Sequence, residues 1–437
     1  MLPNTSAVVT QKSSYYYRIM GGNLVTILFY FLISTSIGDS SFAPAKIKQK
    51  EKNLSKTNCL DVLRMTPGSH LKAAARLTTI KFIENNGYPA EEHQVLTEDG
   101  YYLTMHRIPG KPGSTPVFLQ HGIACSSFDW VLSGKTKALA FILSDQGYDV
   151  WLGNARGNIY SQRHVKYSTS EYKYWNFDWH EMGVYDLPAA LTYVNNKTEK
   201  QMIYIGHSMG TTMFFVMAME KPDVTQKVKA MFALSPVAYM SNFKSPLRMP
   251  AKFTKELEKF MKSVQLGNLF SRNPVFDSFI KYFCCSSSIH QKGCMNIIFS
   301  LFGFNPAQLN KDLLPLILTH VPAGVSLRSI FHYYQAMNSK KFARYDHGVE
   351  ENWKLYNSSE PPEYNVSKIQ TPIGIFWSEN DLITDRDDIL RFYNQLPHKM
   401  LDYKVKDPKF NHIDFTWAND VVDLVYSKLL NAMEKYR

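Results

Sequence analysis

The sequence predicts an α/β fold in which a mainly parallel sheet is flanked by helices and interrupted by an inserted helical cap. Three observations predict it: short apolar runs alternate with helical segments up to Pro236, the alternation then stops, and two further strands and a helix close the chain. Such alternation is typical of a parallel sheet that helices cover on both faces. We therefore expect the core at residues 67–238 and 362–437, and the cap at residues 239–361, where no strand is expected.

The expected elements follow from apolar runs and from the turn residues that end them. The Glu98-Asp99-Gly100 stretch predicts a hairpin turn between the first two strands. Strands are expected at His93–Leu96, Tyr101–Arg107, Pro116–Leu119, Tyr148–Leu152, Met202–Ile205, Lys229–Leu234, Ile373–Trp377 and Leu401–Val405. Helices are expected at Lys137–Gln146, Met182–Asn195, Thr211–Glu220 and Asp420–Tyr436.

The N-terminus carries an apolar run, Leu24–Ile37, preceded by basic residues and by no acidic residue. A membrane-spanning helix needs about 20 apolar residues, whereas a signal peptide uses a shorter run followed by small residues. We expect residues 1–38 to be a signal peptide cleaved after Gly38, with an uncleaved signal anchor in the membrane as the alternative. Residues 39–66 are expected to form a flexible N-terminal segment.

Composition narrows the partners that the chain could have. The 437 residues carry 49 basic and 38 acidic side chains, for a net charge of +11. The basic residues are scattered and do not alternate with aromatic residues, so we expect a solvated surface and no nucleic-acid partner. Apolar residues make up 45% of the chain, which is enough for a large core.

Cysteines and glycosylation motifs agree with a secreted protein. Five cysteines are present, and the spacing allows a bridge between the Cys284/Cys285 pair and Cys294. Motifs for N-glycosylation predict glycans at Asn53, Asn196, Asn357 and Asn365.

A serine follows the strand Met202–Ile205 and precedes an apolar helix, with a glycine two positions away on each side. The pattern is Gly206, Ser208 and Gly210. A serine on a very sharp strand-to-helix turn needs small residues at these two positions. The pattern therefore predicts a nucleophile elbow that lifts the Ser208 hydroxyl out of the sheet.

A serine hydroxyl needs a base, and the base needs an orienting acid. In folds with this elbow, the acid and then the histidine follow late strands. Asp381 follows the strand Ile373–Trp377, and His412 follows Leu401–Val405. Glu379 is an alternative acid, whereas Asp385, Asp387 and Asp388 are expected to begin a helix. The competing histidines are His320, His332, His347 and His398, and His207 is expected to be structural.

Two backbone amides should stabilise the negative charge that develops on a substrate oxygen. The residue after the nucleophile, Met209, is expected to supply one amide. The other is expected from Ile123, after an early strand, where Gly122 lets the backbone approach the substrate. The alternative for this Gly122 stretch is an ordinary tight turn.

Together with these motifs, longer stretches of the chain resemble the acid lipase family, the relatives of gastric and lysosomal acid lipase. The resemblance runs from about residue 67 to the C-terminus. It rests on Tyr88–Pro109, Gln120–Gly122 with Trp130, Tyr148–Gly157, Glu181–Ala190, Gly206–Thr212, Pro322–Gly348, Asn380–Leu382 and His412–Trp417.

The resemblance implies an α/β-hydrolase fold with a lidded cap and hydrolysis of neutral lipid esters through an acyl-enzyme. It places nucleophile, acid and base on Ser208, Asp381 and His412, and the oxyanion donors on Ile123 and Met209, where the family often has glutamine. It also places a disulfide on Cys285 and Cys294, with Cys284 as a possible competitor, and puts Phe302 where a free cysteine is common.

From the resemblance we expect a secreted or lysosomal monomer that works at a lipid droplet or emulsion surface. We expect it to use no metal or organic cofactor. The alternatives are a non-catalytic lipid-binding protein of the same fold and a hydrolase of small esters or thioesters. The many large apolar residues of Phe270–Phe304 predict a lid that opens at a lipid surface, against the alternative of a fixed cap.

Overall fold

The computed structural model describes residues 77–269, 284 and 288–437. The predicted signal peptide, the predicted flexible segment and Asn53 lie outside these residues, as do residues 270–283 and 285–287 of the predicted lid. No helix in the described part of the chain is long and apolar enough to cross a membrane.

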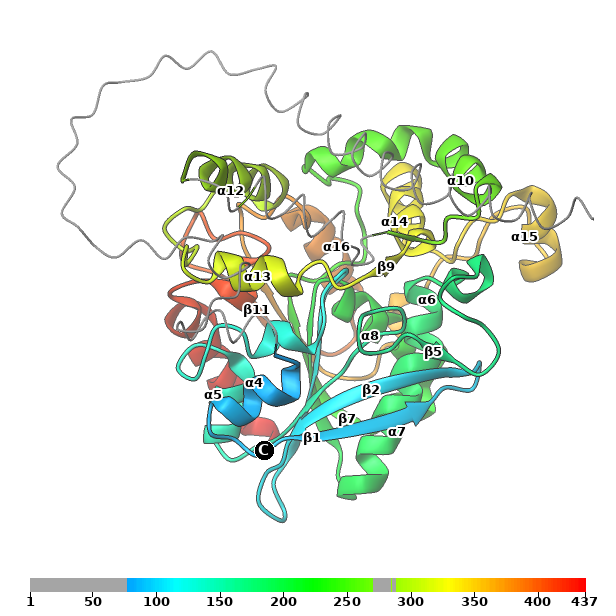
Figure 1. Cartoon of the computed structure of the whole chain (residues 1–437). Helices are drawn as coiled ribbons and strands as arrows, with labels where there is room; N and C mark the ends of the chain where they lie inside the picture. The colour runs from blue at the N-terminus through cyan, green and yellow to red at the C-terminus, as the bar shows by residue number, and fades with distance from the viewer. Residues whose placement is uncertain (1–76, 270–283, 285–287) are drawn as a thin grey trace, which may run out of the picture.

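Nine of the described strands form one large, mainly parallel sheet, as the sequence predicts (Figure 1). Its order is β1-β2-β4-β3-β6-β7-β10-β11, and the short β5 (Arg163–His164) pairs with β2. The first pairings, β1 with β2 and β2 with β4, are antiparallel, and those from β4 to β11 are parallel. The bounds are β1 Glu91–Leu96, β2 Tyr101–Ile108, β3 Pro116–Gln120, β4 Asp149–Leu152, β6 Met202–His207, β7 Val228–Leu234, β10 Ile373–Trp377 and β11 Lys399–Lys404.

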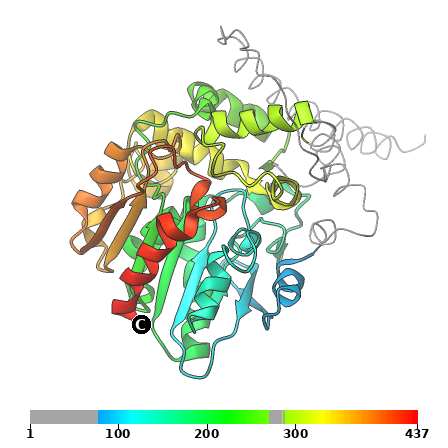
Figure 2. The same cartoon turned by 90° about the vertical axis from the view of Figure 1, so that its left-hand side faces the viewer.

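Helices cover both faces of this sheet. Helices α7 (Leu187–Thr198), α8 (Met209–Glu220) and α16 (Arg386–Gln395) pack in one core cluster, which includes Phe118 of β3. Helices α5 (Leu139–Asp145) and α18 (Ser427–Met433) pack in another, which includes the neighbouring Val117 and Leu119. The alternation along β3 follows because successive side chains of a strand point to opposite faces. Figure 2 shows α18 (red) lying along the sheet.

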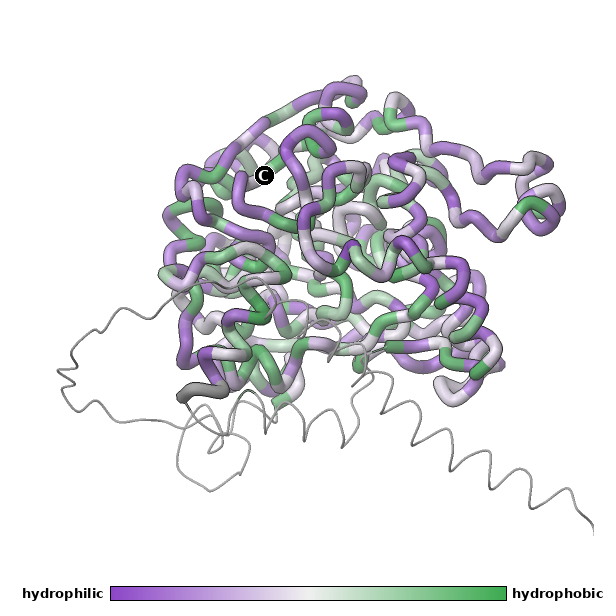
Figure 3. The backbone as a smooth tube through the Cα atoms, turned by 90° about the horizontal axis from the view of Figure 1, so that it is seen from above, coloured by the Kyte–Doolittle hydropathy of each residue, from purple (hydrophilic) through white to green (hydrophobic). Residues whose placement is uncertain are grey.

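Between β7 and β10 the chain is mainly helical and lies at one edge of the sheet (Figure 1). Its helices include η4 Pro246–Phe253, α10 Thr254–Ser263, α12 Ser288–Phe302, α13 Leu314–His320, α14 Leu327–Ser339 and α15 Val349–Tyr356. The expectation that this part has no strand is wrong, because β8 (Asn268–Leu269) pairs with β9 (Val325–Ser326). The boundaries 239–361 remain our proposal for the cap. In Figure 3, hydrophilic residues (purple) are prominent around the outside of the molecule.

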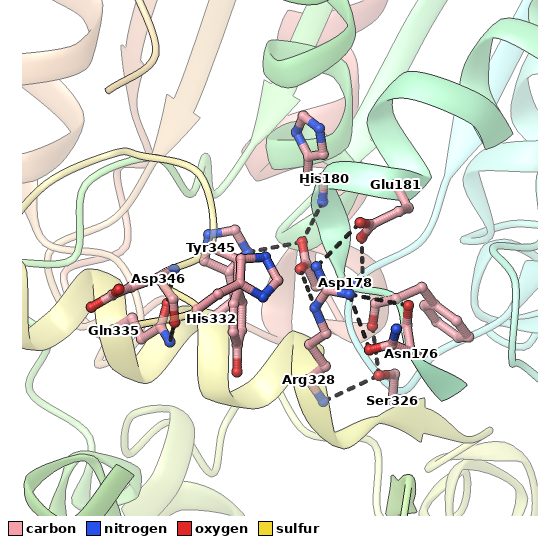
Figure 4. Close-up of polar contacts among 12 residues, drawn as sticks. Asn176, Asp178, His180, Glu181, Ser326, Arg328, His332, Gln335, Tyr345 and Asp346 are labelled. Atoms are coloured by element: carbon pink, nitrogen blue, oxygen red, sulfur yellow. Dashed lines mark hydrogen bonds and ion pairs between the residues drawn. The ribbon is translucent and has the colours of Figure 1, made fainter. Parts of the chain in front are cut away.

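A buried ionic cluster joins this helical part to the core (Figure 4). Asp178, the N-cap of α6 (Trp179–Glu181), accepts from His332 of α14 at 2.8 Å and pairs with Arg328 of the same helix at 3.0 Å. Arg328 also pairs with Glu181 at 3.3 Å. Burial by itself favours a raised pKa for Asp178, but the positive partners outweigh it and the pKa is lowered.

The structure corrects the predicted disulfide. Cys284, and not Cys285, pairs with Cys294 of α12, and their Cα atoms lie 5.1 Å apart. Both bonded cysteines are buried. Neighbouring residues of a chain point in different directions, so only one of two adjacent cysteines is aimed at a given partner.

Candidate active site

Ser208 lies on the sharp turn between β6 and α8, where the sequence predicts it. Its φ of 53° and ψ of −121° are unusual for a residue with a side chain. The two glycines of the motif are required by close packing. A Cβ on Gly206 would lie 2.8 Å from the carbonyl carbon of Gly210, and a Cβ on Gly210 would lie 2.4 Å from the backbone oxygen of Gln120.

The structure brings the predicted serine, histidine and aspartate into one hydrogen-bonded chain. Nε2 of His412 lies 2.9 Å from Oγ of Ser208, and Nδ1 of His412 lies 2.9 Å from Oδ2 of Asp381. All three residues are buried. They come from loops that follow β6, β10 and β11, and these strands run parallel, so their carboxyl ends meet at one edge of the sheet.

The Asp381 carboxylate is held by several donors. The amides of Ile383 and Thr384 donate to Oδ1 at 2.8 and 2.9 Å, and the Thr384 hydroxyl donates to Oδ2 at 2.8 Å. Burial favours a raised pKa, but the positive charge that His412 can carry and these hydrogen bonds outweigh it, so the pKa of Asp381 is lowered. This carboxylate can therefore stay ionised inside the protein and orient the imidazole.

The alternatives for acid and base take other places. Glu379 is exposed and pairs with Lys404 at 2.7 Å. Asp385 caps α16 by accepting from the amide of Asp387. Among the competing histidines, His332 bonds Asp178 and His320 stacks on Phe128.

His207 lies beside the nucleophile but has a structural contact, as expected. Its Nε2 donates to the backbone oxygen of His412 at 3.0 Å. Burial lowers the pKa of His207 to about 3, so the ring is neutral and fixes the backbone of the candidate base.

The two predicted oxyanion amides are available at the elbow. Met209 is the first residue of α8, where backbone amides have no partner within the helix. Gly122 passes so close to the nucleophile that a Cβ there would lie 3.1 Å from Cβ of Ser208, and the next amide belongs to Ile123. Within the described residues, neither the Met209 nor the Ile123 amide has a hydrogen-bond acceptor. Their role stays a prediction.

Sequence reasoning missed Ser235, which touches both the acid and the base. Its Oγ lies 2.6 Å from Oδ2 of Asp381 and 2.8 Å from Nδ1 of His412. One signal could have found it: Ser235 directly follows β7, the strand between β6 and β10. A polar residue at the carboxyl end of a central parallel strand is well placed to enter a site there.

Three of the four predicted glycosylation residues lie in the described chain. Asn196, Asn357 and Asn365 are exposed, so each is accessible to modification. In the parts of the chain that the structure describes, no group of three or more metal-ligating side chains could hold a metal ion.

Comparisons with known proteins agree with this architecture. The chain matches a family model described as the alpha/beta hydrolase fold over residues 115–418, and one described as a partial alpha/beta-hydrolase lipase region over residues 79–134. A candidate lipase from Sulfolobus solfataricus has the same fold, with a TM-score of 0.53 at 13% identity, covering 80% of this chain and 94% of that one. The chain is thus an α/β hydrolase, as predicted.

Three relatives of higher sequence identity are lipases. Human gastric triacylglycerol lipase is 38% identical over 358 residues, which cover 80% of this chain and 89% of the relative. Human lysosomal acid lipase/cholesteryl ester hydrolase is 36% identical over 360 residues, with the same two coverages. Lipase 3 of Drosophila melanogaster is 39% identical over 362 residues, covering 81% of this chain and 92% of the relative.

The chain therefore belongs to the acid lipase family. The predicted family and enzyme class, a lipase, are confirmed.

Proposed function

We propose that this lipase hydrolyses neutral lipid esters, triacylglycerol or cholesteryl ester, through an acyl-enzyme on Ser208. The observation that carries the proposal is the hydrogen-bonded chain from Ser208 through His412 to Asp381. The names of the gastric and lysosomal relatives support the substrate class.

The geometry supports a two-step acyl transfer. Oγ of Ser208 attacks the ester carbonyl carbon while Nε2 of His412 takes its proton, and the carbonyl oxygen becomes an alkoxide that the amides of Ile123 and Met209 stabilise. The alkoxide collapses, the C–O bond to the alcohol breaks, and His412 gives its proton to that alcohol. Water, activated by His412, then attacks the acyl-enzyme, which releases the fatty acid and restores Ser208. Asp381 stays ionised throughout and stabilises the imidazolium.

The proposal is tested by hydrolysis of emulsified triacylglycerol and cholesteryl ester by the full chain and by Ser208→Ala. We expect the wild-type protein to release fatty acid, and the variant to fold normally and lose activity by several orders of magnitude. A serine-reactive phosphonate should label Ser208. Labelling of another serine with Ser208 unmodified would contradict the assignment of Ser208 as the nucleophile. Labelling of Ser208 without hydrolysis of lipid esters would favour a small-ester hydrolase.

We also propose that the protein enters the secretory pathway and is secreted or lysosomal, as the gastric and lysosomal names of the relatives suggest. The exposed motifs at Asn196, Asn357 and Asn365 support this route. Protein from a secretory host should lose mass on enzymatic deglycosylation, and an unchanged mass would count against the proposal. Work at a lipid droplet surface and a monomeric state stay predictions.

A further inference from the structure

Ser235 has a strained backbone that its neighbours hold in place. It follows β7 with a φ of 50°, a left-handed value that is uncommon for a residue with a side chain. Its amide donates to the backbone oxygen of Phe376 in β10 at 2.8 Å, and the residue is fully buried. Strained residues of this kind are concentrated at functional sites.

The Ser235 hydroxyl contacts three polar atoms of the site. Its Oγ lies 2.6 Å from Oδ2 of Asp381, 2.8 Å from Nδ1 of His412 and 3.0 Å from Oγ1 of Thr384. The hydroxyl has one proton to donate, and an ionised carboxylate can only accept. The shortest contact is therefore a hydrogen bond that Ser235 donates to Asp381, which leaves the oxygen lone pairs free to face His412.

This arrangement decides which nitrogen of His412 carries the proton. Nδ1 faces two acceptors, Oδ2 of Asp381 and Oγ of Ser235. A ring nitrogen between two acceptors is stable only when it is protonated. In the neutral ring Nε2 then has the lone pair, and Nε2 is the atom that lies 2.9 Å from Oγ of Ser208.

We propose that Ser235 is a positioning residue of the active site: it orients the Asp381 carboxylate and offers His412 a second acceptor for its Nδ1 proton. The inference rests on the proposed function, because it names a further residue of the same reaction. Ser235 acts through His412 and does not touch substrate, so its hydroxyl matters most when the imidazolium forms. Its loss should lower kcat and leave KM nearly unchanged.

The test compares Ser235→Ala and Ser235→Gly with the wild-type chain. Both variants remove the hydroxyl, but glycine also tolerates the left-handed backbone. The glycine variant therefore separates the effect of losing the hydroxyl from the effect of backbone strain. The matched control is Ser378→Ala, because Ser378 is a buried serine in the loop after β10 whose hydroxyl has no partner within the described residues. We expect kcat to fall about tenfold to a hundredfold in both Ser235 variants, and to stay unchanged in the control.

A double-mutant cycle with Asp381→Asn distinguishes positioning from a general structural role. If Ser235 acts through the Asp381–His412 pair, adding Ser235→Ala to Asp381→Asn should change kcat much less than Ser235→Ala does alone. Fully additive losses, or unchanged kcat in both Ser235 variants, would overturn the inference.

The rate of Ser208 labelling by a phosphonate gives a second readout that needs no lipid substrate. It should slow in the Ser235 variants by a factor similar to the loss in kcat. A wild-type chain that is labelled but hydrolyses no lipid ester contradicts the proposed function, and the labelling rates then still decide the role of Ser235. A wild-type chain that is neither labelled nor active would overturn both.

Discussion

Asp129 carries a buried carboxyl group in the short 3-10 helix η1 (Ser127–Trp130), which follows the proposed oxyanion residue Ile123. Its Oδ2 accepts from the amide of Ser126 at 2.9 Å, whereas its Oδ1 has no hydrogen-bond partner among the described residues. Burial is the largest effect and raises the pKa of Asp129 from 3.8 to about 7. Between these values the folded chain holds a proton that the unfolded chain has released, so this group makes stability fall as pH rises from about 4 to 7.

Asp129→Asn should remove this pH dependence, because an amide cannot ionise. Relative to wild type, the variant should gain stability as pH rises through that window, by up to about 4 kcal/mol above pH 7. Thermal unfolding of both proteins between pH 4 and 8 measures the difference. Parallel curves over the whole range would show that Asp129 ionises normally.

At the residue scale, the position of a residue relative to the strands identified more of the candidate site than its residue type did. Ser208, Asp381 and His412 could be chosen because each follows a strand and the serine has its flanking glycines. Ser235 also follows a strand, but a single serine there is common, and its role depends on contacts with two distant loops. Cys284 and Cys285 could not be told apart, because spacing does not show which neighbour faces Cys294.

At the scale of elements, the C-terminal end of α12 meets the two loops that hold the acid and the base. The backbone oxygen of Phe302 accepts from the amides of Leu382 and His412, each at 3.4 Å. The next residue, Gly303, has a φ of 119°, and a Cβ there would lie 2.1 Å from the backbone oxygen of Asn380. A side chain at Gly303 must therefore displace the Asp381 loop or the end of the helix.

Gly303→Ala should lower both stability and ester hydrolysis, because the acid loop has to move. The matched control is Gly293→Ala inside α12, where a Cβ would meet no described residue within 4 Å and φ is not positive. There alanine should stabilise the protein by about 0.5–1 kcal/mol. Activity and melting temperature of both variants test the contrast, and equal behaviour would show that α12 does not constrain the acid loop.

Whether a segment is a helix or a strand was largely predictable, because apolar residues recur at different spacings in helices and in strands. Local irregularities within the elements were not predictable in this way. The helix expected over Met182–Asn195 begins as a π-helical segment, η3 (Met182–Asp186), before α7. Here Gly183 packs against α8, and a Cβ on it would lie 2.8 Å from Val216. Packing of this kind involves a second helix, so the apolar pattern of the first helix alone does not predict it.

At the scale of the whole molecule, the cluster around Asp178 joins the core to the helical part between β7 and β10. Its partners, Arg328 and His332, lie on α14, whereas Asp178 begins α6 in the core (Figure 4). The Asp178 side chain has no exposed surface, and that of His332 only 2%. Removing one member of a buried ionic cluster leaves its partners without compensation, which destabilises far more than loss of an exposed pair.

Asp178→Asn should therefore destabilise the protein by about 3–5 kcal/mol and lower its melting temperature. The control is Glu351→Gln, which breaks the exposed pair with Lys354 within α15 and should leave the melting temperature unchanged. Because the pKa of Asp178 is lowered, its contribution is present above the ordinary carboxylate pKa and is lost only as pH falls through the lower value of the folded state. A melting-temperature difference between wild type and Asp178→Asn should thus persist from pH 8 to about pH 5. A difference that vanishes within this range would show that Asp178 is not ionised in the cluster.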